Sequence, residues 1–277
     1  ATQPDLFVPT TDDLVRYKEG DLLGFLLNLD EDQRKLTGWA LSGPTMVTGG
    51  AGTGKSTVAL YRVKEVLERP QAKGTERLLF TTYTRALLTV TRQLLEQLLT
   101  PEQLARVQVS TCDQVALEIV KSRRPVKAMA TDRDAMRALR ALRKTFQPSA
   151  ASSFERKLQV RALERLSDQY LLEELDWIIT GRGLGSLAEY LETPRPGRGV
   201  GFTARLRTAV WELYKAFTKG AQGERFPLLR NEALAIVRSG AWSGHWDHVF
   251  VDEAQDLSPA ALSLMAETCR SAEGLFF

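Results

Sequence analysis

The 277-residue sequence predicts an α/β fold in which a parallel sheet is interrupted by an inserted, mostly helical subdomain. Two observations predict this class. Short β-prone runs alternate with helical patterns toward both ends of the chain, as strand–helix–strand units of a parallel sheet do. Between residues 118 and 243 the alternation stops, and only helical periodicity remains.

The predicted strands are short apolar or β-branched runs that stop at glycine or polar residues. The helical patterns between the early strands cover 58–67 and 85–99, and they end before Pro70 and Pro101. Another helix is expected to begin near Ser258 and Pro259, after the fourth strand. The five expected strands are 45–48, 78–82, 107–111, 248–251 and 274–277.

The middle of the chain is expected to be an insert between the third and fourth strands. Its helical stretches are 133–146, 154–179, 202–218 and 228–238, and a loop rich in glycine, proline and arginine covers 193–199. The expected boundaries are therefore an acidic lead segment at 1–20, an α/β domain at 21–117 and 244–277, and the insert at 118–243.

Charge is distributed unevenly along the chain, although the net charge is only +3. Residues 118–243 hold 23 basic and 14 acidic residues, which gives a net charge of +9 for the insert. This excess makes the insert a candidate nucleic-acid surface, although solvated arginine-rich helices explain it equally well. Two cysteines favour a reducing, cytoplasmic location, and the apolar runs are too short to predict a membrane span.

A glycine-rich loop follows the first expected strand and precedes a helix. Residues 49–56 match the pattern G-x-x-x-x-G-K-[ST], whose backbone N–H groups cradle phosphates. Lys55 is expected to reach the β and γ phosphates, and the Ser56 hydroxyl to bind Mg²⁺. An ordinary glycine-rich turn is the alternative. The expected nucleotide contacts are Gly49, Gly50, Ala51, Gly52, Thr53, Gly54, Lys55, Ser56 and Thr57.

The fourth strand ends in a group of carboxylates that could complete such a site. Ligands of parallel sheets bind at the carboxyl ends of the strands, so Asp252 should lie beside the glycine-rich loop and hold Mg²⁺. Glu253 can orient or deprotonate an attacking water. Gln255, in the same segment, is a further candidate catalytic residue together with Lys55. The alternative is a solvated acidic turn that caps the next helix.

In this chain GGAGTGKS is followed by VDEAQD, and this pair of motifs resembles that of the UvrD/Rep/PcrA-like superfamily 1 helicases. By this resemblance Gln33, in LDEDQR, reads the adenine edge of ATP. Tyr83, Thr84 and Arg85, in TTYTR, resemble a box that touches single-stranded DNA, and Thr111 belongs to a similar box after the third strand. The chain departs from the family pattern in having Arg85 in place of Asn, and Cys112 and Asp113 in place of Phe and His.

The resemblance also assigns the two parts of the chain. The α/β part corresponds to the first RecA-like domain of a P-loop NTPase, and the basic insert corresponds to the family's 1B subdomain. Arg205 and Arg207 lie on a stretch similar to the last long 1B helix and are candidate DNA contacts. Trp211 and Tyr214, on the same stretch, are expected to pack in the core rather than stack on bases.

The resemblance implies the ATP-binding half of a 3′–5′ DNA helicase or translocase, with ATP and Mg²⁺ as cofactors and single-stranded DNA as partner. The family's second RecA-like domain, with its arginine finger, has no counterpart in these motifs, so the 277-residue chain alone is expected to be nearly inactive. Two alternatives stay open: a nucleotide-sensing module that binds a protein partner without translocating, and a small-molecule kinase. Stimulation of ATP hydrolysis by single-stranded DNA separates the three.

Overall fold

The computed structural model describes residues 27–70, 72, 74–220 and 223–277, so the expected acidic lead at 1–20 lies outside the described residues. The chain divides into two compact units. The sheet unit comprises the described residues up to Thr111 together with Gly244–Asp256 and Thr268–Phe277. The helical unit comprises Cys112–Ser243 and Leu257–Glu267. No helix among the described residues combines the length and apolar character needed to cross a membrane.

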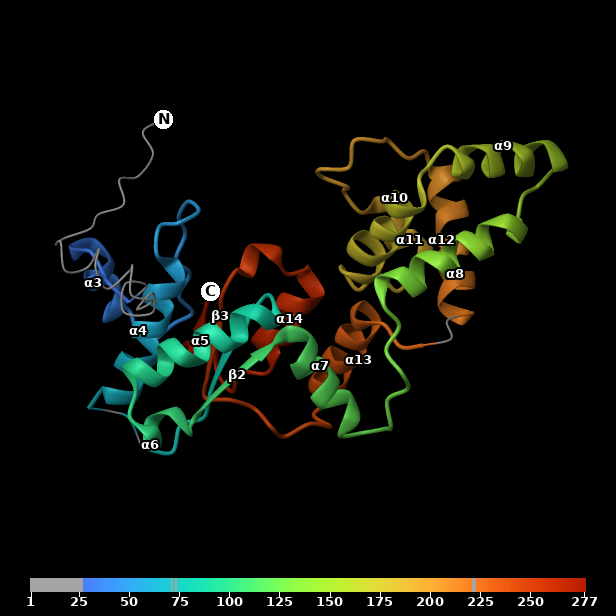
Figure 1. The fold of residues 1–277 in the computed structure, drawn as a ribbon. Helices are drawn as coiled ribbons and strands as arrows, with labels where there is room; N and C mark the ends of the chain where they lie inside the picture. Colours follow the sequence, from blue (N-terminus) through green and yellow to red (C-terminus); the bar gives the residue numbers. More distant parts are fainter. Residues whose placement is uncertain (1–26, 71, 73, 221–222) are drawn as a thin grey trace. The chain divides into compact units, whose positions relative to one another are not determined.

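The sheet unit is built on a four-stranded parallel sheet in the order β2-β1-β3-β4. Figure 1 labels two of these strands, β2 and β3. Three strands have the predicted bounds: β1 (Leu78–Thr82), β2 (Val107–Thr111) and β3 (His248–Val251). The fourth, β4 (Leu275–Phe276), is shorter than the predicted run. The α/β class with a parallel sheet is therefore confirmed.

The prediction of a strand at 45–48 is wrong as it stands, because Thr45 forms only a single parallel bridge with Phe276. The segment nevertheless runs beside β4. The amides of Thr45 and Val47 donate to the carbonyls of Leu275 and Phe277 at 3.0 and 2.8 Å, and the Phe277 amide donates to Thr45 at 2.9 Å. The two-residue β4 offers too few partners for a longer ladder, and glycines follow at once.

Four described α-helices belong to the sheet unit. They are α3 (Glu31–Thr37), α4 (Lys55–Glu68), α5 (Arg85–Leu98) and the short α6 (Pro101–Leu104), with single 3-10 turns η2 (Ala254–Asp256) and η3 (Ala272–Gly274). The aromatic rings of Phe80, Phe250 and Phe276 form a row across β1, β3 and β4, and the apolar residues of α4 and α5 pack against it. Alternation along the strands places these rings on one face.

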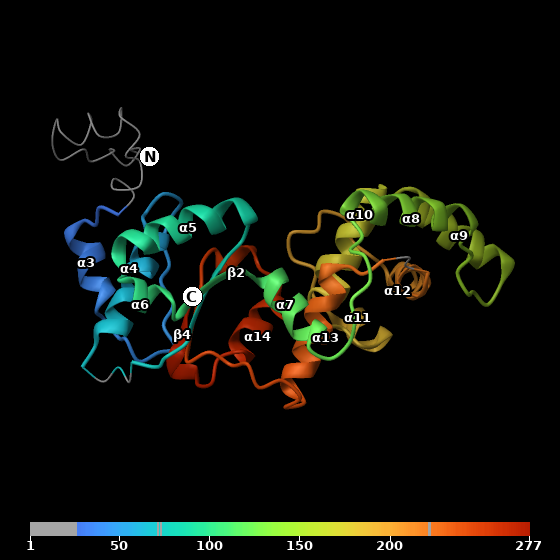
Figure 2. The same ribbon diagram turned by 60° about the horizontal axis from the view of Figure 1, so that its bottom comes forward.

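The helical unit has no strand among its described residues, as the sequence predicts (Figures 1 and 2). One predicted helix, 154–179, is in fact three segments, because Ser167 caps a new helix by accepting a hydrogen bond from the Tyr170 amide. The unit consists of α7 (Cys112–Lys121), α8 (Asp132–Thr145), α9 (Ser153–Glu164), α10 (Asp168–Glu173), the π-helix η1 (Glu174–Thr180), α11 (Leu187–Glu192), α12 (Ala204–Lys219), α13 (Phe226–Arg238) and α14 (Pro259–Glu267).

The first segment of this unit ends at the predicted 243, but the unit starts before the predicted 118 and includes a second segment. It begins at Cys112 and takes in 257–267, because α13 packs against both α7 and α14. Trp211 and Tyr214 belong to its core, with ring centroids 5.4 Å apart, as expected from their spacing on α12. The packing of α13 against α7 and α14 could not be predicted from the sequence pattern, which indicates only where helices begin and end.

Candidate nucleotide-binding site

The loop at 49–54 has a backbone that only glycine adopts without strain at two positions. Gly52 and Gly54 have φ angles of 75° and 71°, in the left-handed region. A Cβ atom on Gly54 would lie 2.5 Å from Gln33 Nε2, and one on Gly49 would lie 2.7 Å from Thr53 Oγ1. The loop is therefore packed closely against its surroundings and leads directly into α4, which begins at Lys55.

The first turn of α4 has no side-chain cap. Its N-cap, Gly54, makes no side-chain capping bond, so this end of the helix favours an anion. The Lys55 ammonium group donates to the carbonyls of Gly49 and Gly50 at 3.0 and 2.7 Å. Lys55 is thus held over the loop, where an ammonium group would meet a bound phosphate.

Helix α3 lies beside the loop and is joined to it through Gln33. The Gln33 Nε2 group donates to the Thr53 carbonyl at 3.1 Å, while Oε1 accepts from the Asp30 amide at 2.8 Å. Asp30 in return accepts from the Gln33 amide, which completes a capping box at the start of α3. The structure therefore places Gln33 next to the loop, with both the nitrogen and the oxygen of its side-chain amide bonded to backbone groups.

Ser56 and Asp252 come together although 196 residues separate them. The Ser56 hydroxyl donates to Asp252 Oδ1 at 2.8 Å. Burial raises the pKa of the Asp252 carboxyl above its ordinary value, and the hydrogen bond from Ser56 opposes that shift. A hydroxyl and a carboxylate are hard oxygen ligands, which Mg²⁺ prefers, and a cation would offset the cost of burying this carboxylate. The two residues fit a Mg²⁺ ion.

Glu253 stands in a strained backbone conformation at the end of β3. Its φ angle of 52° lies in the left-handed region, which costs a non-glycine residue about 1–2 kcal/mol. The Glu253 amide donates to Asp252 Oδ1 at 3.1 Å, and the Gln255 side chain donates to the Glu253 carboxylate. Strain of this kind is found mostly at functional sites, where the surrounding structure maintains it.

The predicted DNA-contact residues of the sheet unit lie at the carboxyl ends of β1 and β2. Tyr83 is 47% exposed, and both Thr84 and Arg85 are exposed where β1 ends and α5 begins. Thr111 ends the neighbouring strand, in register with Thr82, but only 7% of it is exposed. Tyr83, Thr84 and Arg85 thus offer accessible groups, whereas Thr111 has little accessible surface.

The two arginines predicted to contact DNA from α12 differ in their surroundings. The Arg205 side chain is 76% exposed and lies 3.6 Å from Glu155. The Arg207 guanidinium instead donates to the carbonyls of Tyr190, Leu191 and Thr193 at 2.5, 3.0 and 2.8 Å, at the end of α11. Arg207 therefore holds the helical unit together, and only Arg205 presents an accessible cation.

Arg62 belongs to none of the sequence motifs, but the structure connects it to the site. Arg62 lies on α4, and its guanidinium donates to the carbonyls of Leu36, Trp39 and Ala40 at the end of α3. It also lies over the Phe276 ring, 4.7 Å from the centroid. Its one signal in the sequence is an arginine among the apolar positions of the helix at 58–67.

These features define the P-loop NTPase class. They are a parallel sheet, a glycine-rich loop, a lysine at the start of the helix that follows the loop, and an acidic strand end beside the loop. The family model described as the UvrD/REP helicase N-terminal domain matches residues 29–193, more than half of the chain. The chain therefore belongs to the UvrD-like superfamily 1 helicases and is an ATP-binding helicase domain of RecA-like fold. No curated protein matches it.

Proposed function

We propose that this chain is the ATP-binding half of a DNA helicase or translocase that couples ATP hydrolysis to movement on single-stranded DNA. The observation that supports it most is the hydrogen bond between Ser56 and Asp252, since it brings the loop and the acidic strand end into one site. If the loop were only a glycine-rich turn and the acidic segment only a helix cap, Ser56 and Asp252 would have no need to lie in contact.

The roles that we propose follow from the positions of the side chains. Lys55 would exchange its two loop carbonyls for phosphate oxygens, and the backbone N–H groups of residues 49–57 would bind the remaining oxygens. Ser56 and Asp252 would hold Mg²⁺, which neutralises the charge on the phosphates. Glu253 would orient the attacking water, with its carboxylate positioned by Gln255. Gln33 would contact the adenine after exchanging one of its present partners.

We further propose that single-stranded DNA binds at the exposed Tyr83, Thr84 and Arg85 and on basic residues of the helical unit such as Arg205. The support is the accessibility of these side chains and the charge of +9 over residues 118–243. The 3′–5′ direction, and the need for a second RecA-like domain to complete catalysis, rest on the family resemblance alone.

The test is steady-state phosphate release by the full-length protein, with and without saturating single-stranded DNA. We expect DNA to stimulate hydrolysis, and a rate that does not respond to DNA would contradict the translocase. A nucleotide-sensing module or a small-molecule kinase would give that unresponsive result.

The binding test uses the 277-residue chain and a labelled oligonucleotide at several salt concentrations. Each phosphate contact contributes about −0.7 to the log–log salt slope for single strands, so four to six contacts predict a slope of about −3 to −4. Arg205→Glu should make the slope shallower. Arg133→Glu, on α8, is the matched charge reversal elsewhere in the unit, and a flat salt response would contradict a DNA surface.

A further inference from the structure

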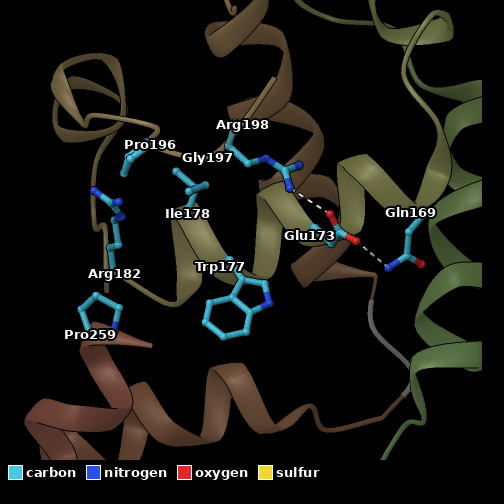
Figure 3. A pocket seen from close by; sticks show the side chains of 9 residues that line it. All are labelled: Gln169, Glu173, Trp177, Ile178, Arg182, Pro196, Gly197, Arg198 and Pro259. Atoms are coloured by element: carbon cyan, nitrogen blue, oxygen red, sulfur yellow. Dashed lines mark hydrogen bonds and ion pairs between the residues drawn. The ribbon is translucent and has the colours of Figure 1, made fainter. Parts of the chain in front are cut away.

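The helical unit contains a pocket of about 500 Å³ whose walls come from α10, η1, the turn that follows η1, the loop at 193–199 and the start of α14 (Figure 3). This volume lies in the range of small-ligand sites. Its apolar walls are Trp177, Ile178, Pro196 and Pro259, and Arg182 and the Glu173–Arg198 ion pair provide the polar groups. The prolines make two of these walls rigid.

Trp177 is exposed in this pocket although it belongs to a helix that is held on its other sides. It is 46% exposed, and Figure 3 shows its indole projecting from η1, between Arg182 and Glu173 in that view. Asp176 forms two hydrogen bonds with Arg225, at 2.7 and 2.6 Å, and the Thr180 carbonyl accepts from Asn231 at 2.8 Å. The helix backbone is therefore held in place, and Trp177 presents an exposed apolar face from it.

The π-helical geometry of η1 is a second indication that the exposed face of Trp177 has a function. The Gly181 amide donates to the Asp176 carbonyl at 2.7 Å and the Leu184 amide to Ile179 at 3.0 Å, five residues back in each case. π-helices are rare and occur frequently at functional sites. A Cβ atom on Gly181 would lie 2.7 Å from the Trp177 carbonyl, so the turn that carries Arg182 depends on this glycine.

A buried carboxylate holds the loop that forms the opposite rim. Glu174 is fully buried and accepts from Arg195 at 2.6 and 2.7 Å and from the Tyr190 hydroxyl at 2.8 Å. Arg198 donates to Glu174 at 3.2 Å and to Glu173 at 2.8 Å. The rim is therefore positioned before any ligand binds, which lowers the entropic cost of binding.

The charge at the pocket favours an anion. The acidic side chain at its wall, Glu173, is neutralised by the ion pair with Arg198 and accepts from Gln169 at 2.9 Å. These two hydrogen bonds hold the pKa of the Glu173 carboxyl below its ordinary value, with Gln169 the larger cause. Arg182 adds a positive charge to the wall, with no such carboxylate partner in the described part of the pocket. An aromatic face beside a cation suits a base and its phosphate.

We propose that this pocket binds one nucleotide of a single-stranded DNA strand, with the base stacked on Trp177 and its phosphate paired with Arg182. The proposal rests on the proposed DNA-binding function and adds a specific site to it. The indole face accepts any base, so the site requires no particular sequence.

The experiment measures binding of the 277-residue chain to labelled oligo(dT), to an abasic oligonucleotide of the same length, and to free dTMP. Loss of base–aromatic stacking predicts that Trp177→Ala weakens oligo(dT) binding by about 5- to 150-fold without changing the salt slope. Arg182→Ala should instead make the slope shallower by about 0.7. Phe154→Ala, which removes a 70% exposed aromatic of the same unit, and Arg161→Ala are the matched controls. Abasic DNA should bind the Trp177→Ala variant and the parent equally.

The outcomes separate the pocket from the wider function. Tight oligo(dT) binding that is unchanged in Trp177→Ala overturns the pocket and leaves the proposed function intact. A parent chain that binds neither oligo(dT) nor dTMP overturns both. Binding of dTMP that depends on Trp177, without binding of oligo(dT), overturns the strand as the source and the proposed function, while the nucleotide chemistry of the pocket stands. Circular dichroism of each variant, matching the parent, excludes misfolding as the cause of a loss.

Discussion

Replacement of Arg62 by methionine should loosen the segment that carries Gln33 against the phosphate-binding loop. Arg62 is 3% exposed and bonds three carbonyls at the end of α3, while its guanidinium lies over Phe276. Methionine keeps most of the apolar stem and removes all three donors. The substitution therefore tests the hydrogen bonds rather than the packing.

The magnitude follows from the fate of the three carbonyls. A hydrogen bond from a charged donor contributes about 1.5–3 kcal/mol, but burial of the guanidinium, which lowers the pKa of Arg62, offsets part of this. In the variant, the Ala40 carbonyl keeps its hydrogen bond from Thr45 Oγ1 at 3.0 Å, and the carbonyl of the exposed Trp39 can bond to water. We expect a net loss of about 2–4 kcal/mol in the free energy of unfolding, comparable with other broken buried networks.

The assay is thermal unfolding combined with nucleotide titration. A loss of about 2–4 kcal/mol predicts a fall in Tm of about 4–16 °C for a chain of this size. Affinity for a fluorescent ATP analogue should also fall severalfold, since α3 would no longer hold Gln33 at Thr53. Arg34→Met, an exposed arginine of α3, is the control and should change neither quantity. A Tm equal to that of the parent protein in Arg62→Met would refute the reasoning.

Three further predictions concern the nucleotide site. Lys55→Ala should weaken binding of the ATP analogue about 10- to 100-fold in a Mg²⁺ titration, because a charge-assisted contact of about 1.5–3 kcal/mol is lost. Lys64→Ala, on the same helix, should bind like the parent, and equal affinities for Lys55→Ala would contradict the assignment. Glu253→Gln should bind ATP normally yet abolish turnover in the full-length protein; hydrolysis at the parental rate excludes Glu253 as the catalytic carboxylate. Asp252→Asn should raise the Tm of the nucleotide-free chain at pH 7. The pKa of Asp252 is higher in the folded than in the unfolded chain, so ionisation of this carboxyl destabilises the fold at every pH above the pKa of the unfolded chain. That gain should disappear as the pH falls toward about 4, and equal melting temperatures at neutral pH would contradict the raised pKa.

Elements whose formation depends mainly on residues adjacent in the sequence were predicted correctly. β1, β2 and β3 have their predicted bounds because each is a short apolar run between polar or glycine residues, a signal contained within the strand itself. The loop at 49–56 was equally clear, since glycines at fixed offsets from Lys55 allow its positive φ angles. The run at 45–48 failed as a strand because its pairing depends on the short β4, which lies about 230 residues further along the chain.

The sequence by itself determined the α/β class, the position of the glycine-rich loop and the position of the acidic segment that follows β3, because each is a local pattern with a local physical cause. Only the tertiary structure decided which of these residues meet. It joined Ser56 to Asp252 and Gln33 to Thr53, and it bonded the Arg207 guanidinium to backbone carbonyls near the end of α11. The same reason applies to Arg62 and to the π-helix around Trp177. The Arg62 guanidinium depends on carbonyls of another helix, and the π-helix is held by Arg225 and Asn231 of α13 and the segment before it. No pattern along the chain indicates those partners.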